Sequence, residues 1–314
     1  MNNKLLVILG TTSTGKTDLA LDLAKKLNGE IVSADSRQVY KYLDIGTGKL
    51  PGSYESLEKN DNYWEIDGIK IWMYDAAEPQ NRFNLYEYIK KSEAIVEDIT
   101  RRGKLPILVG GTGLYIRSLL EGITNYGVAE DTDLREELED LDTTEIKKRI
   151  DSNTLKNLNN SDINNKRRLI RLVELTSQTR SEETFEGIES KYQILKVGLT
   201  LNREDLKSRI SKRLISRINQ GMIEESRDLL DKGILSYQRM EELGLEYRYL
   251  AKFIKGEIKQ IEDFLNQLTV KISQYAKRQE TWFKKEKNVQ WFNIQDADLN
   301  LKLEKAVTDW YNSK

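Results

Sequence analysis

An apolar run that leads into a glycine-rich loop sets the strongest constraint on this chain. Residues 5–9 are all aliphatic, the pattern G-x-x-x-x-G-K-T follows at once, and apolar residues then repeat at helical spacing. A strand, such a loop and a helix, in that order, place backbone N–H groups around a polyphosphate at a helix N-terminus. A glycine turn with a purely structural role is the alternative, but the flanking strand and helix favour phosphate binding. We therefore predict a phosphate-binding loop made of Gly10, Thr11, Thr12, Ser13, Thr14, Gly15, Lys16 and Thr17.

Two side chains at the end of this loop bear on its chemistry. Lys16 is expected to reach the phosphate oxygens, and the hydroxyl of Thr17 is expected to ligate Mg²⁺. The pattern predicts that a polyphosphate binds, but it does not identify the polyphosphate or its fate.

The composition removes several kinds of chemistry. The 314 residues include no cysteine, which excludes disulfides and thiolate nucleophiles, and no histidine, which excludes imidazole acid–base chemistry. Proton transfer is therefore left to Asp, Glu, Lys or Tyr. Lys and Arg number 50 against 51 Asp and Glu, so the mean charge indicates no polyanionic partner. No apolar stretch reaches the ~18 residues of a membrane helix and none resembles a signal peptide, so a soluble cytoplasmic protein is expected.

Strand and helix patterns alternate over the first part of the chain. Strands are predicted at 5–9, 30–34 and 105–109, with helices after the phosphate loop and over 84–101. This alternation is typical of an α/β fold, here a P-loop-type parallel sheet core covered by helices. Ligands of such sheets lie beyond the carboxyl ends of the strands, which is where the phosphate loop and the segments 35–38 and 110–113 fall.

After Leu120 the pattern changes. Residues 121–191 are charged, rich in Asn and helical in pattern, whereas 194–199 again read as a strand. An all-helical insertion domain at 121–191, between the two pieces 1–120 and 192–314 of one core, explains this order. A separate C-terminal domain from Glu121 onwards would leave the later strand without a sheet. From Arg203 the chain is predicted to be helical, apart from a short strand near 289–294.

Asp35 is the first candidate for catalysis. It ends an apolar strand and precedes Ser-Arg-Gln. A carboxylate beside a Mg²⁺–diphosphate site can serve as a general base or a metal ligand, and a helix N-cap is the structural alternative. The strand at 105–109 ends in Gly110-Gly111-Thr112 rather than in an aspartate, which argues against a nucleotide hydrolase. The glycine pair lets backbone approach a ligand, or else forms a tight turn.

Basic residues gather locally despite the balanced total. One cluster lies in the insertion, one follows it as a stripe, and one lies near the C-terminus among aromatic residues. A single stripe is more often a solvated face, but the three together favour contact with nucleic acid through phosphate neutralisation and base stacking. The clusters comprise Lys166, Arg167, Arg168 and Arg171; Arg209, Arg213 and Arg217; and Lys271, Lys277, Arg278, Lys284 and Lys285.

Several segments together resemble the tRNA dimethylallyltransferases, also called tRNA isopentenyltransferases. They occur in family order over nearly the whole chain and comprise residues 10–17, 33–41, 44–49, 108–115 and 275–283. The resemblance implies transfer of a dimethylallyl group from dimethylallyl diphosphate to N6 of the adenosine adjacent (3′) to the tRNA anticodon. It also implies Mg²⁺ as cofactor and tRNA as partner. Nothing in the chain suggests a partner subunit, and a monomer is expected.

The resemblance also implies roles for individual residues. Asp35 would be the general base, Thr112 would lie near the reacting centre, and Arg135 would face tRNA in the reaction channel. The loop would hold the diphosphate with help from Arg209 and Arg213. The insertion would grip the anticodon arm. The expected tRNA contacts are Asp35, Ser36, Arg37, Gln38, Arg135, Arg167, Arg168, Arg171, Lys277 and Arg278.

The chain departs from the family pattern where RNA contacts are expected. The family often has His-His-Leu-Ile-Asp at 71–75, His-Pro-Asn-Asp at 161–165 and Gly-Tyr-Lys/Arg-Glu at 244–248, and this chain has other residues there. Three alternative functions remain open. They are a P-loop small-molecule kinase, a dimethylallyltransferase acting on free adenylate, and an RNA-binding protein that has lost catalysis. The C-terminal basic–aromatic helix argues against the first, the insertion against the second and Lys16 with Asp35 against the third.

Overall fold

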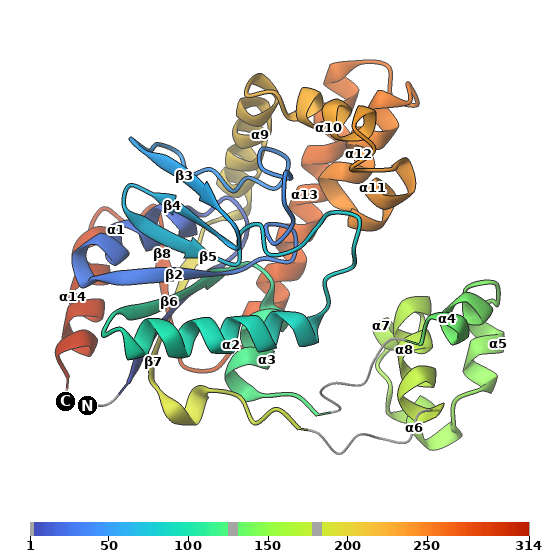
Figure 1. Ribbon diagram of the computed structural model, residues 1–314, viewed down its shortest axis with the longest axis horizontal. Coiled ribbons are helices and arrows are strands. Elements are labelled where there is room, and N and C mark those ends of the chain that lie inside the picture. Colours follow the sequence, from blue (N-terminus) through green and yellow to red (C-terminus); the bar gives the residue numbers. More distant parts are fainter. Residues whose placement is uncertain (1–2, 125–130, 178–183, 314) are drawn as a thin grey trace. The chain divides into compact units, whose positions relative to one another are not determined.

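Figure 1 shows the computed structural model of the chain, which describes residues 3–124, 131–177 and 184–313. It comprises two compact units: a core unit of residues 1–120 and 188–314, and an insertion unit of residues 121–187. Residues 188–191 precede a core strand and include the short 3-10 helix η1 (Glu189–Lys191). The N–H of Ile188 donates to the carbonyl of Leu119, so the chain has rejoined the core at that point.

An eight-stranded mixed sheet forms the centre of the core unit, in the order β3-β4-β5-β2-β6-β1-β7-β8. From β5 to β8 the neighbouring strands are parallel, while β3, β4 and β5 form an antiparallel meander at one edge. The predicted α/β class with a mostly parallel sheet is confirmed, and the meander is an addition that the sequence analysis missed. The strands are β1 (Lys4–Gly10), β2 (Gly29–Ala34), β3 (Leu57–Asn60), β4 (Tyr63–Ile66), β5 (Ile69–Trp72), β6 (Leu105–Gly110), β7 (Gln193–Thr200) and β8 (Val289–Asn293).

Helices bury both faces of the sheet (Figure 1). On one face, Leu6 and Ile8 of β1 pack in a cluster with α1 (Lys16–Leu27) and α14 (Leu299–Asn312). On the other face, α2 (Leu85–Arg101) and α3 (Gly113–Glu121) bury their own apolar residues. Because both faces are covered, the central strands are continuous apolar runs rather than alternating ones.

Five further helices complete the core unit. They are α9 (Arg203–Asn219), α10 (Met222–Asp231), α11 (Tyr237–Leu243), α12 (Leu245–Ile254) and α13 (Ile261–Phe283). α13 packs against α9 and α12 and also contacts β1. Consequently a helix from near the C-terminus lies beside the strand that leads into the glycine-rich loop. No helix in the described ranges is long and apolar enough to cross a membrane.

The insertion unit is helical. Its helices are α4 (Thr132–Glu139), α5 (Thr143–Lys148), α6 (Ser152–Asn157), α7 (Asn160–Ile163) and α8 (Lys166–Ser177). They enclose a small apolar core of their own, which includes Leu138, Ile146 and Ile170. Within its described residues the extended pairing is one isolated bridge between Ile123 and Phe185, without a strand.

Candidate active site

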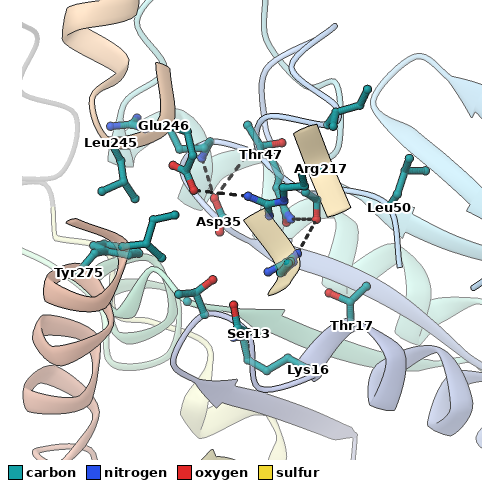
Figure 2. A pocket seen from close by; sticks show the side chains of 18 of the residues that line it. Ser13, Lys16, Thr17, Asp35, Thr47, Leu50, Arg217, Leu245, Glu246 and Tyr275 are labelled. Atoms are coloured by element: carbon teal, nitrogen blue, oxygen red, sulfur yellow. Dashed lines mark hydrogen bonds and ion pairs between the residues drawn. The ribbon is translucent and has the colours of Figure 1, made fainter. Parts of the chain in front are cut away.

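A cavity of about 1030 Å³ opens beyond the carboxyl ends of β1, β2 and β6. Gly110 lies beside Leu9 of β1 and beside Ala34 of β2, so the loops that follow these three strands converge. Residues of α9, α12 and α13 line the rest of the cavity. Figure 2 shows Ser13 and Lys16 on one side of it and Asp35 and Glu246 facing them. All the lining residues belong to the core unit.

The glycine-rich loop has the shape that anion binding requires. Gly15 precedes α1 with φ 84°, and no side chain caps the helix there. The first N–H groups of a helix have no intrahelical partner and attract anions. Inside the loop, Thr14 Oγ1 donates to the carbonyl of Thr11 at 2.9 Å. Of the predicted loop residues, those lining the cavity are Thr12, Ser13, Gly15, Lys16 and Thr17, while Gly10, Thr11 and Thr14 shape the turn.

Cations surround the loop, from exposed Arg209 to buried Arg217. Arg209 Nε donates to the carbonyl of Ser13 at 3.0 Å, and Arg213 Nη2 donates to the carbonyl of Gly48 at 3.1 Å. Burial, and then the charge of Arg213, lower the pKa of Lys16 to about 7. The charge of Arg217, and then burial, lower the pKa of Arg213 to about 9. Cations that disfavour one another in this way create a strong attraction for a polyanion.

Gly48 allows Arg213 and Arg217 of α9 to approach the backbone of the segment 44–49 closely. Its φ is +65°, and a Cβ there would lie 1.8 Å from Arg217 Nη2 and 2.6 Å from Arg213 Nη2. A side chain at this position would have to displace both guanidinium groups. The glycine belongs to the segment 44–49 that carries part of the family resemblance.

Two charged residues that the sequence analysis missed hold the segment 44–49 in place. Glu225 of α10 accepts hydrogen bonds from the consecutive backbone N–H groups of residues 44, 45 and 46, at 3.1, 2.8 and 3.0 Å. Lys49 is fully buried, bonds to Asp44 at 2.7 Å and pairs with Asp75. Buried charges persist when they are satisfied in this way, so the segment is a rigid wall of the cavity.

Asp35 directly precedes a turn over residues 36–39, and no helix starts there, so the helix N-cap alternative is wrong. Its Oδ1 accepts from the backbone N–H of Arg37 at 2.8 Å and more weakly from that of Gln38. These bonds orient the carboxyl group in the wall of the cavity. Thr112 Oγ1 accepts from the N–H of Ser36 at 3.1 Å, which joins the glycine turn after β6 to the Asp35 segment. The Gln38 amide bonds to both Ser33 Oγ and the Gly48 carbonyl.

Another partly buried carboxyl group faces this cavity. Glu246 of α12 pairs with Arg217 at 3.5 Å, and burial raises the pKa of its carboxyl group. It stands in the segment 244–248 where the chain departs from the family pattern. Leu245, in the same segment, has φ 39° and lines the cavity, as does Tyr275 (Figure 2).

The predicted RNA-contacting residues fall into two groups. On α13, Arg278 lines the cavity with its guanidinium 5.7 Å from the Tyr275 ring centre, whereas Lys277 is exposed and is not part of the lining. The remaining arginines, Arg135, Arg167, Arg168 and Arg171, belong to the insertion unit.

In the insertion unit, Glu174 organises two of these arginines. It is fully buried and accepts from Arg135 Nη2 at 2.8 Å and from Arg171 Nη1 at 3.0 Å. Burial by itself would raise the pKa of Glu174, but the two arginines outweigh it and the pKa is lowered. Arg168 pairs with Asp162, and Arg167 is exposed. The roles expected for these arginines toward tRNA remain predictions.

A glycine-rich loop after a central parallel strand, beside clustered cations and across from a carboxylate, defines a phosphate-loop α/β protein with a site suited to a polyanion. A family model described as IPP transferase matches residues 38–286. The tRNA dimethylallyltransferase of Staphylococcus haemolyticus is 36% identical over 315 residues, covering 97% of this chain and 91% of that protein. The tRNA dimethylallyltransferase 2 of Treponema denticola is 39% identical over 288 residues, covering 90% and 92%.

Solved structures agree with these sequence matches. The crystal structure of the tRNA delta(2)-isopentenylpyrophosphate transferase of Staphylococcus epidermidis is 35% identical, covers 99% of this chain and 100% of its own, and superposes with a TM-score of 0.67. The chain therefore belongs to the IPP transferase family of tRNA dimethylallyltransferases.

Proposed function

We propose that this protein transfers a dimethylallyl group from dimethylallyl diphosphate to N6 of the adenosine 3′ to a tRNA anticodon, releasing diphosphate. The observation that carries the proposal is that one cavity holds both the phosphate loop with its cations and the carboxylate of Asp35. Breaking an allylic carbon–oxygen bond builds negative charge on the leaving diphosphate. Cations positioned beforehand for that charge contribute most to lowering the barrier.

The diphosphate would be bound by the N–H groups at the start of α1 and by Lys16, Arg209 and Arg213. Among the described residues no group of three or more Asp or Glu is arranged to hold a metal ion. This fits Mg²⁺ bound mainly by diphosphate oxygens and water, with the Thr17 hydroxyl as its ligand from the protein. When bound, Mg²⁺ would neutralise part of the charge on the leaving group.

The proton has a clear destination in this scheme. The N6 amine forms a bond to the allylic carbon as the carbon–oxygen bond breaks, and the amine then carries an extra proton. Asp35 would accept it, because Oδ1 is held by backbone N–H groups and the carboxyl group faces the cavity. A positioned carboxylate acts as a general base without histidine. Thr112 supports the segment by bonding to Ser36.

The tRNA would be bound by both units. Arg37, Gln38 and Arg278 line the cavity and would contact the anticodon loop that delivers the adenosine. Ser36 and Lys277 would add contacts beside them, and the insertion would grip the anticodon arm through Arg135, Arg167, Arg168 and Arg171. We further propose that the protein acts as a monomer in the cytoplasm, where its substrates meet.

A transfer assay tests the proposal. Purified protein, Mg²⁺ and radiolabelled dimethylallyl diphosphate are incubated with unmodified tRNA, with AMP, or with neither. Label in tRNA alone supports the proposal. Label in AMP would assign the protein to the free-nucleotide enzymes. In a parallel incubation with ATP, turnover of ATP without transfer would favour a kinase. Binding of tRNA without any label would indicate lost catalysis.

A further inference from the structure

Gln279 of α13 places a buried amide between two loops of the active site. The residue is 6% exposed. Its Oε1 accepts from the backbone N–H of Thr12 at 2.9 Å, and its Nε2 donates to the carbonyl of Gly111 at 2.8 Å. One side chain therefore bonds to the phosphate loop and to the glycine turn after β6 at the same time. The partners fix the orientation of the amide, because an N–H needs an acceptor and a carbonyl needs a donor.

The glycine turn is shaped around this amide. A Cβ on Gly111 would lie 2.4 Å from Gln279 Nε2, so any other residue there would push the amide away. Its neighbour Gly110 is required for a different reason, since a Cβ would lie 2.1 Å from the carbonyl oxygen of Ala34. The glycine pair thus allows close packing within the protein: Gly110 packs against the backbone of β2, and Gly111 makes room for Gln279.

Both bonds lead directly to groups with a proposed role in the reaction. Thr12 precedes Ser13, whose carbonyl accepts from Arg209. Gly111 precedes Thr112, whose hydroxyl accepts from the N–H of Ser36. Ser36 follows Asp35 in the chain. Beyond the backbone pairing of β1, β6 and β2, the amide of Gln279 thus adds a side-chain link between the phosphate loop and the turn that bonds to the Asp35 segment.

We propose that Gln279 is a positioning residue, which fixes the phosphate loop relative to the Asp35 segment so that leaving group and base stay aligned. This inference rests on the proposed function. The Thr12 N–H is occupied by Gln279, so the N–H groups that meet the diphosphate are those from Ser13 onwards. A small misalignment of reacting groups lowers rates by about 10²-fold, so loss of the amide acts on the transfer step.

The test compares two substitutions with a control. Gln279→Leu removes both hydrogen bonds at similar size. Gln279→Glu keeps the acceptor but sets a second oxygen against the Gly111 carbonyl. Gln267→Leu, on the exposed side of the same helix, is the control. We expect the single-turnover transfer rate, with tRNA and dimethylallyl diphosphate saturating and normalised to active sites, to fall by about 10–10²-fold in both Gln279 variants and not in the control.

The pH dependence of Gln279→Glu gives a readout that general loss of structure would not produce. A protonated carboxyl group can donate to Gly111 and accept from Thr12, as the amide does. The transfer rate of Gln279→Glu, relative to that of the wild-type protein, should therefore recover as the pH falls through the pKa of the new carboxyl group. Burial raises this pKa above the usual value of about 4.3. Gln279→Leu should show no such recovery.

A measurement independent of activity separates this inference from the proposed function. Hydrogen exchange of backbone amides in segments 10–17 and 34–38 should rise together in Gln279→Leu, with exchange on the far side of the sheet unchanged. A wild-type protein without transfer activity would overturn the proposed function, and the exchange data would still decide whether Gln279 links the two loops. The inference would be overturned if both Gln279 variants kept a transfer rate per active site within twofold of wild type. It would also be overturned if hydrogen exchange in the two segments did not rise together in Gln279→Leu.

Discussion

The ammonium group of Lys16 donates a hydrogen bond of 2.7 Å to the carbonyl oxygen of Thr11, in the same loop. This bond holds the amine inside the cavity, where burial and Arg213 lower its pKa to about 7. A diphosphate oxygen offers the same amine a charged partner in place of a neutral carbonyl. Binding of a diphosphate should therefore raise the pKa of Lys16.

Diphosphate binding should take up protons at pH 8. Above pH 7 most Lys16 is neutral, and the bound anion favours the protonated amine, so uptake of up to about one proton is expected. The apparent affinity should fall as the pH rises above 7. Calorimetry in two buffers of different ionisation enthalpy measures the uptake. Lys16→Met supplies the control, because it retains the titration of the ligand and of Arg213 but not that of Lys16. Equal uptake by both proteins would contradict the prediction.

Asp35→Asn should lower the single-turnover transfer rate by about 10²–10⁴-fold, the usual contribution of a general base. The amide is nearly isosteric and can still accept the backbone hydrogen bond from Arg37. The affinity for tRNA, measured by filter binding, should stay within about twofold of wild type. A large loss of tRNA affinity with a normal rate at saturation would make Asp35 a recognition residue instead.

Gly48→Ala should weaken diphosphate binding by at least about tenfold, since the added methyl group displaces the guanidinium groups of Arg213 and Arg217. Gly68→Ala is the matched control. Gly68 also has a positive φ, +77°, but nothing lies within 4 Å of a Cβ there. Both variants share the backbone strain of about 1 kcal/mol, so a difference in diphosphate affinity reports the arginines alone. Equal affinities in the two variants would disprove the steric argument.

Arg167→Ala and Arg168→Ala should each weaken tRNA binding and reduce the slope of log affinity against log salt by roughly 0.7–1. Both side chains are exposed on α8 of the insertion unit. Arg101→Ala serves as the control, because that residue pairs with Asp98 on α2 of the core unit. The slope comes from binding measured at several salt concentrations. An unchanged slope in the α8 variants would remove this helix from the RNA interface.

Arg171→Ala carries an added structural effect. Arg171 shares the buried Glu174 with Arg135, so its removal leaves one arginine to balance that carboxylate. We expect lower stability of the insertion unit together with weaker tRNA binding. Thermal unfolding, measured beside the salt slope, separates the two effects.

The sequence predicts the parts of this molecule in which local pattern and burial agree. The strand that became β1, the loop and α1 follow one another within about two dozen residues, and each has its own signal. Within the meander, β4 does alternate, with Trp64 and Ile66 buried, but it is only four residues long. β3 could not be predicted, because it reads Leu-Glu-Lys-Asn, four largely exposed residues whose side chains carry no apolar pattern. Such a strand is defined by its pairing with β4 rather than by its own composition.

The partners of buried polar groups could not be predicted from spacing. Glu225 meets residue 44 from 181 positions away, and nothing local marks it. Gln279 did leave a signal. The buried residues of α13 follow a helical stripe through Leu268, Ile272, Ala276 and Phe283, and Gln279 lies on that stripe. A polar side chain on an apolar stripe requires a hydrogen-bond partner, although the sequence alone does not identify it.

The hydrogen bond between Thr12 and Gln279 joins residues 267 positions apart, and β1 pairs with β7, which is synthesised after the whole insertion. On the ribosome the glycine-rich loop thus emerges early but acquires its final partners only when α13 has been made. Contacts so distant in sequence form late, because the intervening chain must first be closed into a loop. The phosphate-loop sequence is therefore made long before the residues of α13 that hold it beside the glycine turn after β6.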